Sequence, residues 1–283
     1  MKTTSGLTDL FETHFFPVKA TSGMVNLENI VTCFSVIPYE NLTKIIRASV
    51  VKEPDKRLRG PREVLEDYIR YGAGGTCFSL TNCLRALLQE YDYTGYFRMA
   101  DLGSRQNNHC ALVVNIEDRR WLLDPGYLVT RPLPIPEKGS VMHETLLRPV
   151  LLERDRIKNG LNFSTVETDG IRHRYHLHGN DCSETEFIRY WHDSFTWNMM
   201  HSMLVTKVVP GGRFYLHDQH VRWFDRSGHK SGKLKDHFDD AVNEYTGIDR
   251  AIVVKAREIL SAYRTDLRER KKRYGKTSNP RTG

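Results

Sequence analysis

The sequence predicts an α+β protein in which a helical N-terminal section is followed by a small barrel or curled sheet and then by a mixed α/β section. Apolar residues recur with a helical period as far as Tyr91, the period shortens towards two between Gly95 and Leu177, and turns, short strands and a long amphipathic helix follow. No internal repeat interrupts this order. The expected sections are 1–93, 94–188 and 189–283.

Composition indicates a globular protein. Of 283 residues, 39% are hydrophobic and 10% aromatic, too many for a disordered chain. Mean hydropathy is −0.52, and no apolar run approaches the ~18 residues of a membrane span. Residues 1–10 lack the pattern of a secretory signal, and the five cysteines form no Cys-x-x-Cys pair. We expect a cytoplasmic protein with reduced thiols and no membrane contact.

Positive charge is concentrated near the C-terminus. The net charge is +7, and residues 264–276 supply +5 of it through seven Lys/Arg against Asp266 and Glu269. The rest of the chain is nearly neutral, which argues against a nucleic-acid partner. We expect a solvated, frayed basic tail.

The first section is expected to contain four helices. Pro61 stands at a position favoured in the first helical turn. Leucines with helical spacing follow Cys77. The expected helices are Leu7–Thr13, Asn26–Pro38, Pro61–Tyr71 and Cys77–Tyr91.

Cys77 is the candidate nucleophile. A glycine loop, residues 72–75, runs into its helix, so the thiol lies in the first turn, where free N–H groups and the helix dipole favour thiolate. The same N–H groups could stabilise an oxyanion, and Gly75 lets a substrate approach the backbone. The structural alternative is a small buried residue, which is how we interpret Cys33, Cys83 and Cys110.

The middle section is expected to be built from strands. The expected strands are Gly95–Ala100, His109–Ile116, Arg120–Asp124 and Arg172–Leu177, with a proline-marked loop at 132–136. With residues 117–118 as a two-residue hairpin loop, Asp124 lies opposite Ala111 and diagonal to His109, on the same face. A buried His and Asp can satisfy each other, either as base and orienter or as a purely structural pair.

The third section combines helices and strands. A helix near Ser183–His192 begins it, and a turn at residues 210–212 separates two of its strands. The expected strands are Ser202–Val209, Arg213–His217 and Val221–Phe224, and a long amphipathic helix starts near Asp249.

A cysteine at a helix start combined with a His–Asp hairpin suits nucleophilic acyl transfer, in an arrangement similar to that of cysteine proteases. Asp124 would fix the imidazole tautomer, and His109 would take the proton from Cys77. Proteases, transglutaminases and acyltransferases share these residue types and this order, so the pattern leaves all three open.

Four segments together resemble the arylamine N-acetyltransferase family. Residues 37–42 (IPYENL) look like its Pro-Phe-Glu-Asn-Leu signature, and residues 74–77 are similar to its Arg-Gly-Gly-x-Cys loop. Residues 109–127 resemble its histidine strand and aspartate hairpin, and residues 186–213 resemble the entry to its third domain. The resemblance covers roughly residues 7–250.

This resemblance implies an N-terminal helical bundle, a central β-barrel and a C-terminal α/β lid. It also implies ping-pong chemistry, in which acetyl-CoA acylates Cys77 and an arylamine, hydrazine or N-hydroxyarylamine then takes the acetyl group. Tyr39 and Tyr127 match positions that line the acceptor pocket, where an aromatic amine could stack on them; ordinary core packing is the alternative. The oligomeric state is left open.

Two residues near the nucleophile depart from the family pattern. Ala73 stands where the family has arginine, and Ser79 where it has Glu or Gln. We therefore expect the nucleophile loop to lack the side-chain pair that would hold it in place, a brace, and turnover to be slow. Ala73→Arg combined with Ser79→Glu is expected to increase turnover.

Other functions remain as alternatives. An open pocket would favour an amide synthase of the polyketide type, a cysteine hydrolase would need water at the acyl-enzyme, and the departures could mark an inactive member. His173, His176 and His178 cluster, but they fall short of the ligand set that zinc requires, so no metal is expected.

Overall fold

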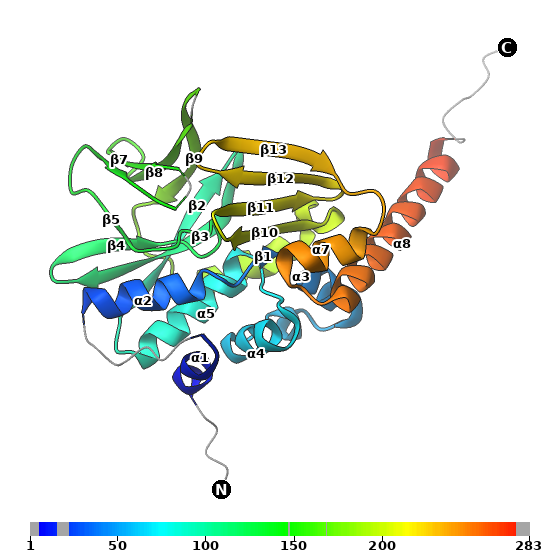
Figure 1. The fold of residues 1–283 in the computed structure, drawn as a ribbon, viewed down its shortest axis with the longest axis horizontal. Coiled ribbons are helices and arrows are strands. Elements are labelled where there is room, and N and C mark those ends of the chain that lie inside the picture. Colours follow the sequence, from blue (N-terminus) through cyan, green and yellow to red (C-terminus); the bar gives the residue numbers. More distant parts are fainter. Residues whose placement is uncertain (1–5, 16–22, 147, 168, 276–283) are drawn as a thin grey trace, which may run out of the picture.

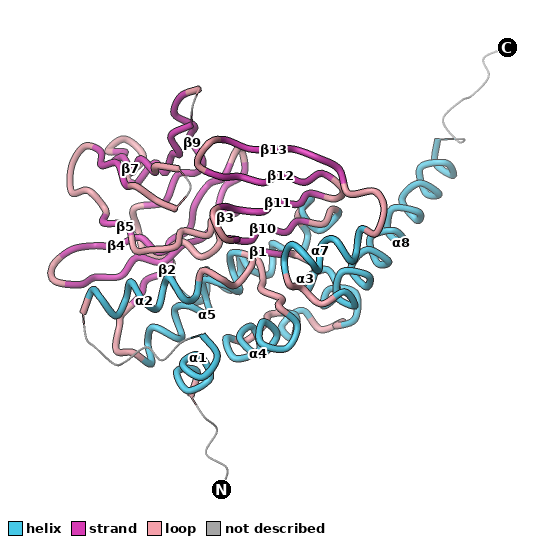
Figure 2. Tube along the Cα trace, in the orientation of Figure 1, coloured by secondary structure: helices cyan, strands magenta, loops and turns pink. Residues whose placement is uncertain are grey.

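A computed structural model describes residues 6–15, 23–146, 148–167 and 169–275. Most helices lie along one side of the molecule, and the strands lie on the other side in two sheets (Figures 1 and 2). This is the α+β arrangement that the sequence predicts, with N-terminal helices, a nearly closed barrel, and a C-terminal sheet with helices. No helix of the described residues is long and apolar enough to cross a membrane.

The N-terminal helices bury one apolar core around the helix that carries Cys77. Phe11, Phe34, Leu65, Phe78 and Leu84 belong to this core and are at most 2% exposed. The helices are α1 (Leu7–Phe15), α2 (Met24–Phe34), α3 (Leu42–Val50), α4 (Pro61–Tyr71) and α5 (Cys77–Glu90), with a short 3-10 turn at Pro54–Arg57.

One of the expected helices ends earlier than predicted, and one helix was not expected. Helix α2 ends at Phe34, before the expected Pro38; the helical region is disfavoured for Ile37, the residue before the proline, so the helix does not continue into Pro38. Helix α3 was not expected from the sequence. Its apolar residues Leu42 and Ile45 pack on the C-terminal sheet, and its periodic stretch is too short to stand out.

The middle section forms an eight-stranded antiparallel sheet in the order β5-β4-β3-β2-β9-β8-β7-β6. Strand β3 alternates between two cores: Cys110, Leu112 and Val114 face the helices, whereas Ala111 and Val113 face the barrel interior. The strands are β2 (Gly95–Leu102), β3 (Arg105–Ile116), β4 (Arg119–Leu123), β5 (Leu133–Pro134), β6 (Ser140–His143), β7 (Val150–Asp155), β8 (Gly160–Glu167) and β9 (Gly170–His178).

Strands β2, β3, β4 and β9 confirm the four expected strands of this section. Strands β5 to β8 were not expected. Part of the proline-marked loop forms β5, in which Leu133 pairs with Leu122 at the edge of the sheet. Proline is tolerated there because an edge strand need not donate a second ladder hydrogen bond.

The C-terminal section is a five-stranded sheet backed by helices. Its order is β1-β10-β11-β12-β13, so β1 from the N-terminal section pairs with β10 through Tyr39 and Thr206. The elements are β1 (Tyr39–Glu40), α6 (Glu184–Asp193), β10 (Leu204–Val209), β11 (Gly212–His217), β12 (His220–Asp225), β13 (Gly228–Lys233), α7 (Phe238–Thr246) and α8 (Arg250–Gly275), with 3-10 turns at Ser194–Thr196 and Asn198–His201.

The basic segment near the C-terminus is helical as far as Gly275, which corrects the expected frayed tail. Arg264 binds Asp218 at 2.8 Å, so the start of the segment is tied to the C-terminal sheet. Residues 276–283 lie outside the described residues. The division into three sections stays a proposal, and its second boundary would fall within α6.

Candidate active site

The loop before Cys77 is held by strand β1. The backbone N–H of Glu40 donates to the carbonyl of Gly75 at 2.9 Å, and the N–H of Gly75 donates to the carbonyl of Pro38 at 3.3 Å. Helix α5 then begins at Cys77, as expected, with Thr76 as its N-cap residue. The thiol therefore lies at a helix N-terminus, where unpaired N–H groups collect.

The hairpin of β3 and β4 brings His109 and Asp124 together. Glu117 and Asp118 both have positive φ angles, 51° and 60°, as a two-residue type I′ turn requires. Leu112 pairs with Leu123, the register assumed in the sequence argument. Nε2 of His109 donates to Oδ2 of Asp124 at 2.7 Å, so the predicted juxtaposition of the two side chains is confirmed.

Asp124 is fully buried and accepts two further hydrogen bonds. The N–H of Tyr127 donates to Oδ1 at 2.8 Å, and the hydroxyl of Tyr175 donates to Oδ2 at 2.7 Å. Tyr175 comes from β9, 51 residues along the chain, and no local pattern could have linked it to Asp124. These donors fix the orientation of the carboxylate, which in turn fixes the orientation and the tautomer of the His109 imidazole.

Cys77 and His109 meet at the backbone of Gly126. A Cβ atom on Gly126 would lie 2.5 Å from Cβ of Cys77 and 3.1 Å from Cε1 of His109. Because Nε2 of His109 binds Asp124, Nδ1 is the ring nitrogen left for the thiol. Glycine at 126 is thus what allows the two side chains to approach each other.

The surroundings favour a thiolate–imidazolium pair. A hydrogen bond with the thiol of Cys110 lowers the pKa of Cys77 most; burial opposes this, and His109 lowers the pKa further. Burial lowers the pKa of His109, but the charges and hydrogen bonds of Asp124 and Cys77 outweigh it and raise that pKa to about 10. Cys110, interpreted from sequence as a core residue, is buried as expected and also contacts Cys77.

Lys44 of α3 is a second feature that the sequence analysis missed. Its ammonium is buried, donates to the hydroxyl of Ser194 and lies 4.5 Å from the ring centroid of Phe195. Burial lowers the pKa of Lys44 to about 7, and the charge of Lys44 lowers the pKa of Cys77. Below neutral pH, Lys44 therefore adds a positive charge near the thiolate.

Replacing Lys44 with Met, which keeps an unbranched side chain but removes the ammonium, is expected to raise the pKa of Cys77. Lys44 is charged mainly below its pKa of about 7, so the effect should be clear near pH 6 and fade near pH 8. A rise of one pKa unit from about 5 should slow alkylation of Cys77 by iodoacetamide about fivefold at pH 5 and about twofold at pH 6. Lys52→Met, at an exposed lysine, is the control; identical pH profiles for Lys44→Met and wild type would contradict the prediction.

A cavity of about 600 Å³ opens at Cys77 and His109. Tyr39 and Tyr127, both expected at a substrate pocket, line it. Gly75 does not line the cavity, which corrects its expected place. A Cβ there would lie 2.1 Å from the hydroxyl oxygen of Ser79, so Gly75 packs against the first turn of α5. Among the described lining residues there is no carboxylate, and there are four arginines: Arg105, Arg174, Arg213 and Arg222.

The nucleophile loop has a brace, contrary to expectation. Ala73 and Ser79 are buried, and the hydroxyl of Ser79 donates to the carbonyl of Thr76 at 3.1 Å. A guanidinium from another segment, that of Arg59, donates to the carbonyl of Gly74 at 2.6 Å. The expectation failed because it considered only the two positions where the family pattern has partners.

The histidines of β9 bind protein groups. His176 contacts Asn162 at 3.0 Å and His178 contacts Asp101 at 2.9 Å, whereas His173 is exposed. Across the part of the chain that the structure describes, no group of three or more His, Cys, Asp or Glu side chains could hold a metal ion.

Comparisons with known proteins agree with this architecture. A family model described as N-acetyltransferase matches residues 24–255, whereas no curated protein sequence matches the chain significantly. The arylamine N-acetyltransferase structure of Mycobacterium abscessus has a TM-score of 0.77 at 17% identity, covering 90% of this chain and 94% of that chain. That of Salmonella typhimurium has a TM-score of 0.75 at 15% identity, covering 91% and 99%.

A third structure, the Mycobacterium marinum arylamine N-acetyltransferase in complex with CoA, has a TM-score of 0.73 at 19% identity and covers 91% of this chain and 96% of that chain. At these identities the structural matches establish the fold, and the family model spans most of the sequence. The chain belongs to the arylamine N-acetyltransferase family.

Proposed function

We propose that this protein is an acetyl-CoA-dependent N-acetyltransferase of arylamines, hydrazines or N-hydroxyarylamines, with Cys77 as nucleophile, His109 as base and Asp124 as orienter. The observation that carries the proposal is the contact of Cys77 with His109 and of His109 with Asp124 at the wall of one cavity. Family membership supports acetyl transfer as the reaction class.

Acylation follows from the geometry of these groups. Nδ1 of His109 takes the thiol proton, and the sulfur of Cys77 attacks the carbonyl carbon of acetyl-CoA. N–H groups at the start of α5 are suited to stabilise the oxyanion that forms. The carbon–sulfur bond to CoA then breaks, and the imidazolium returns its proton to the departing CoA thiolate.

Acetyl transfer to the amine uses the same groups, with the amine as nucleophile and the sulfur of Cys77 as leaving group. The amine nitrogen attacks the thioester carbon and gives its proton to His109. The bond to the sulfur of Cys77 breaks, the amide leaves, and the thiol recovers its proton from the imidazolium. The product contains one new carbon–nitrogen bond, and the enzyme is returned unchanged.

The cavity lining supports both substrates. The rings of Tyr39 and Tyr127 offer aromatic surface to a flat amine. The positive charge of Arg105, Arg213 and Arg222 suits the phosphates of a CoA thioester. The related Mycobacterium marinum enzyme was crystallised with CoA, which supports the same donor here.

Incubation with acetyl-CoA in the absence of amine tests the proposal. Intact-mass spectrometry should show one added acetyl group, and peptide mapping should place it on Cys77 and on none of the other cysteines. Addition of an arylamine should release it as the acetylated amine. Release into water at the same rate without amine would indicate a cysteine hydrolase, and absence of the adduct would reject the proposal.

A further inference from the structure

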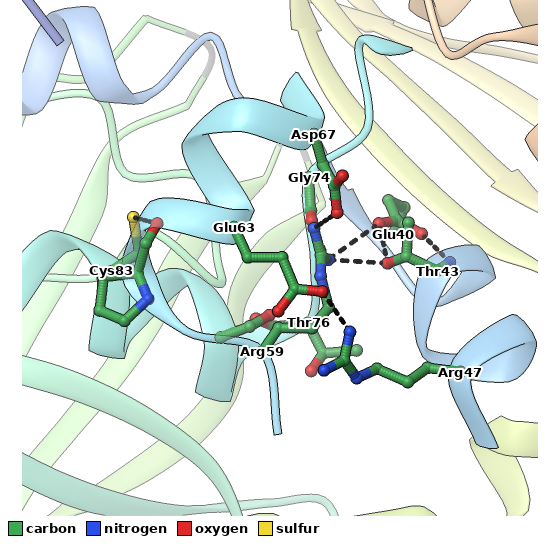
Figure 3. A network of polar contacts seen from close by, with 11 residues as sticks. Glu40, Thr43, Arg47, Arg59, Glu63, Asp67, Gly74, Thr76 and Cys83 are labelled. Carbon is green, nitrogen blue, oxygen red and sulfur yellow. Dashed lines mark hydrogen bonds and ion pairs between the residues drawn. The ribbon is translucent and has the colours of Figure 1, made fainter. Parts of the chain in front are cut away.

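Arg59, between the 3-10 turn and α4, lies beneath the nucleophile loop (Figure 3). Its side chain is only 6% exposed. One terminal nitrogen donates to the carbonyl of Gly74 at 2.6 Å and to the hydroxyl of Thr43 at 2.9 Å, and the other donates to Asp67 at 2.5 Å. The guanidinium therefore joins α3, α4 and the loop at a single point.

Arg59 also faces the buried carboxylate of Glu40 at 3.9 Å. Burial raises the pKa of Glu40, and the charge of Arg59 acts against this increase. The carboxylate accepts from the N–H of Thr43 at 2.9 Å and from its hydroxyl at 2.5 Å. The carboxylate of Glu40 could not remain buried at low cost without Arg59, whereas Arg59 also pairs with Asp67 at 2.5 Å.

Arg59 and Glu40 together hold two successive carbonyl groups of the loop. The guanidinium binds the carbonyl of Gly74, and the backbone N–H of Glu40 binds the carbonyl of Gly75. Each bond fixes the orientation of one planar peptide unit. These are the two units that lead directly into Thr76 and Cys77, so their orientation determines where the thiol and the first N–H groups of α5 point.

The loop needs this external support because it is built from glycine. A Cβ on Gly74 would lie 1.8 Å from the carbonyl oxygen of Pro38, so no larger residue fits there without a rearrangement. Glycine gives up the most backbone freedom on folding and does not limit its own conformation. A fixed donor is therefore the means by which the chain can make this segment rigid.

We propose that Arg59 is a positioning residue for Cys77, replacing from a different segment the arginine that the family pattern places at Ala73. The inference rests on the proposed acetyl transfer. Ala73 is fully buried, so a restored arginine there would crowd the core beside a brace that already exists. Ala73→Arg with Ser79→Glu is accordingly expected to reduce turnover, the opposite of the expectation from sequence.

The test distinguishes two roles of Arg59: orienting the loop through Gly74, and neutralising the buried charge of Glu40. Arg59→Met alone leaves Glu40 buried and unpaired, whereas Arg59→Met combined with Glu40→Gln removes both charges. If Arg59 positions the loop through Gly74, the double variant should fold and still transfer acetyl groups about 10- to 100-fold more slowly than Glu40→Gln, mainly in kcat.

Two further variants complete the comparison. Arg47→Met removes a neighbouring arginine that pairs with Glu63 (Figure 3) and should leave turnover unchanged. Arg59→Lys keeps the charge for Glu40 but lacks the planar fork that reaches Gly74 and Asp67 together, so it should fold and remain slow.

Full turnover in Arg59→Lys, or in the double variant relative to Glu40→Gln, would overturn the proposal, as would loss of folding in the double variant. Amide hydrogen exchange at residues 74–78 should be faster in the double variant than in Glu40→Gln, whatever reaction the enzyme performs. If wild type is not acetylated by acetyl-CoA, the proposed function fails, and this exchange measurement still decides the role of Arg59.

Discussion

Replacing Asp124 with Asn is expected to lower kcat for acetyl transfer by about 10³- to 10⁴-fold while the protein stays folded. The carboxylate accepts from three donors: Nε2 of His109, the hydroxyl of Tyr175 and the N–H of Tyr127. An amide has only one acceptor oxygen. If that oxygen keeps the N–H of Tyr127, the amide NH₂ faces His109, Nε2 becomes an acceptor, and Nδ1 carries the proton that the base must be free to take up.

Single-turnover acetylation of Cys77 measures this effect directly. Tyr175→Phe is the matched control, because it removes one donor to Asp124 but keeps the ring that stacks on Phe163 at 4.6 Å. That variant should lose about 10- to 100-fold, the scale of one hydrogen bond to a charged group, and so less than Asp124→Asn. Asp124→Asn with turnover within tenfold of wild type would leave the His109–Asp124 pair as a structural contact.

Gly126→Ala is expected to have the next largest effect, a loss of about 10²-fold or more in kcat/KM. The added methyl would lie 2.5 Å from Cβ of Cys77, 2.9 Å from its Cα and 3.1 Å from Cε1 of His109. Real Cβ atoms do not approach other atoms so closely, so Cys77 and His109 would have to move apart. A displacement of about 1 Å at reacting groups can cost about 10²-fold in rate.

The rate of alkylation of Cys77 and its pH profile should change together with turnover in Gly126→Ala, because separation from His109 removes one cause of the lowered thiol pKa. Gly95→Ala is the control, since its added methyl would meet its nearest neighbour at an ordinary 3.8 Å. Equal turnover in Gly126→Ala and Gly95→Ala would show that the backbone at 126 has room to adjust.

Local patterns predicted the parts of the site that depend on neighbours in the chain. The glycine loop followed by leucines at helical spacing placed Cys77 at the start of α5, and the two-residue loop at 117–118 fixed the register that puts His109 near Asp124. Both rest on short-range geometry. The periods of a helix and a strand determine which side chains share a face, so both appear directly as patterns of apolar residues in the sequence.

Contacts between distant segments were not predicted. Tyr175 reaches Asp124 across the barrel, and Lys44 lies beside Phe195 although about 150 residues separate them in sequence. Helix α3 and strands β5 to β8 were also not predicted, because these elements are short and their apolar faces are buried only by packing against other elements.

The sequence by itself determined the family, the fold class, the helix that carries Cys77 and the pairing of His109 with Asp124, because each rests on patterns that are local along the chain. The tertiary structure alone decided what holds the nucleophile loop. Seen from the sequence, Ala73 suggested an absent brace, yet Arg59 reaches the same loop from another segment. A guanidinium on a long side chain can serve a site from several backbone positions, and only packing determines which of them does.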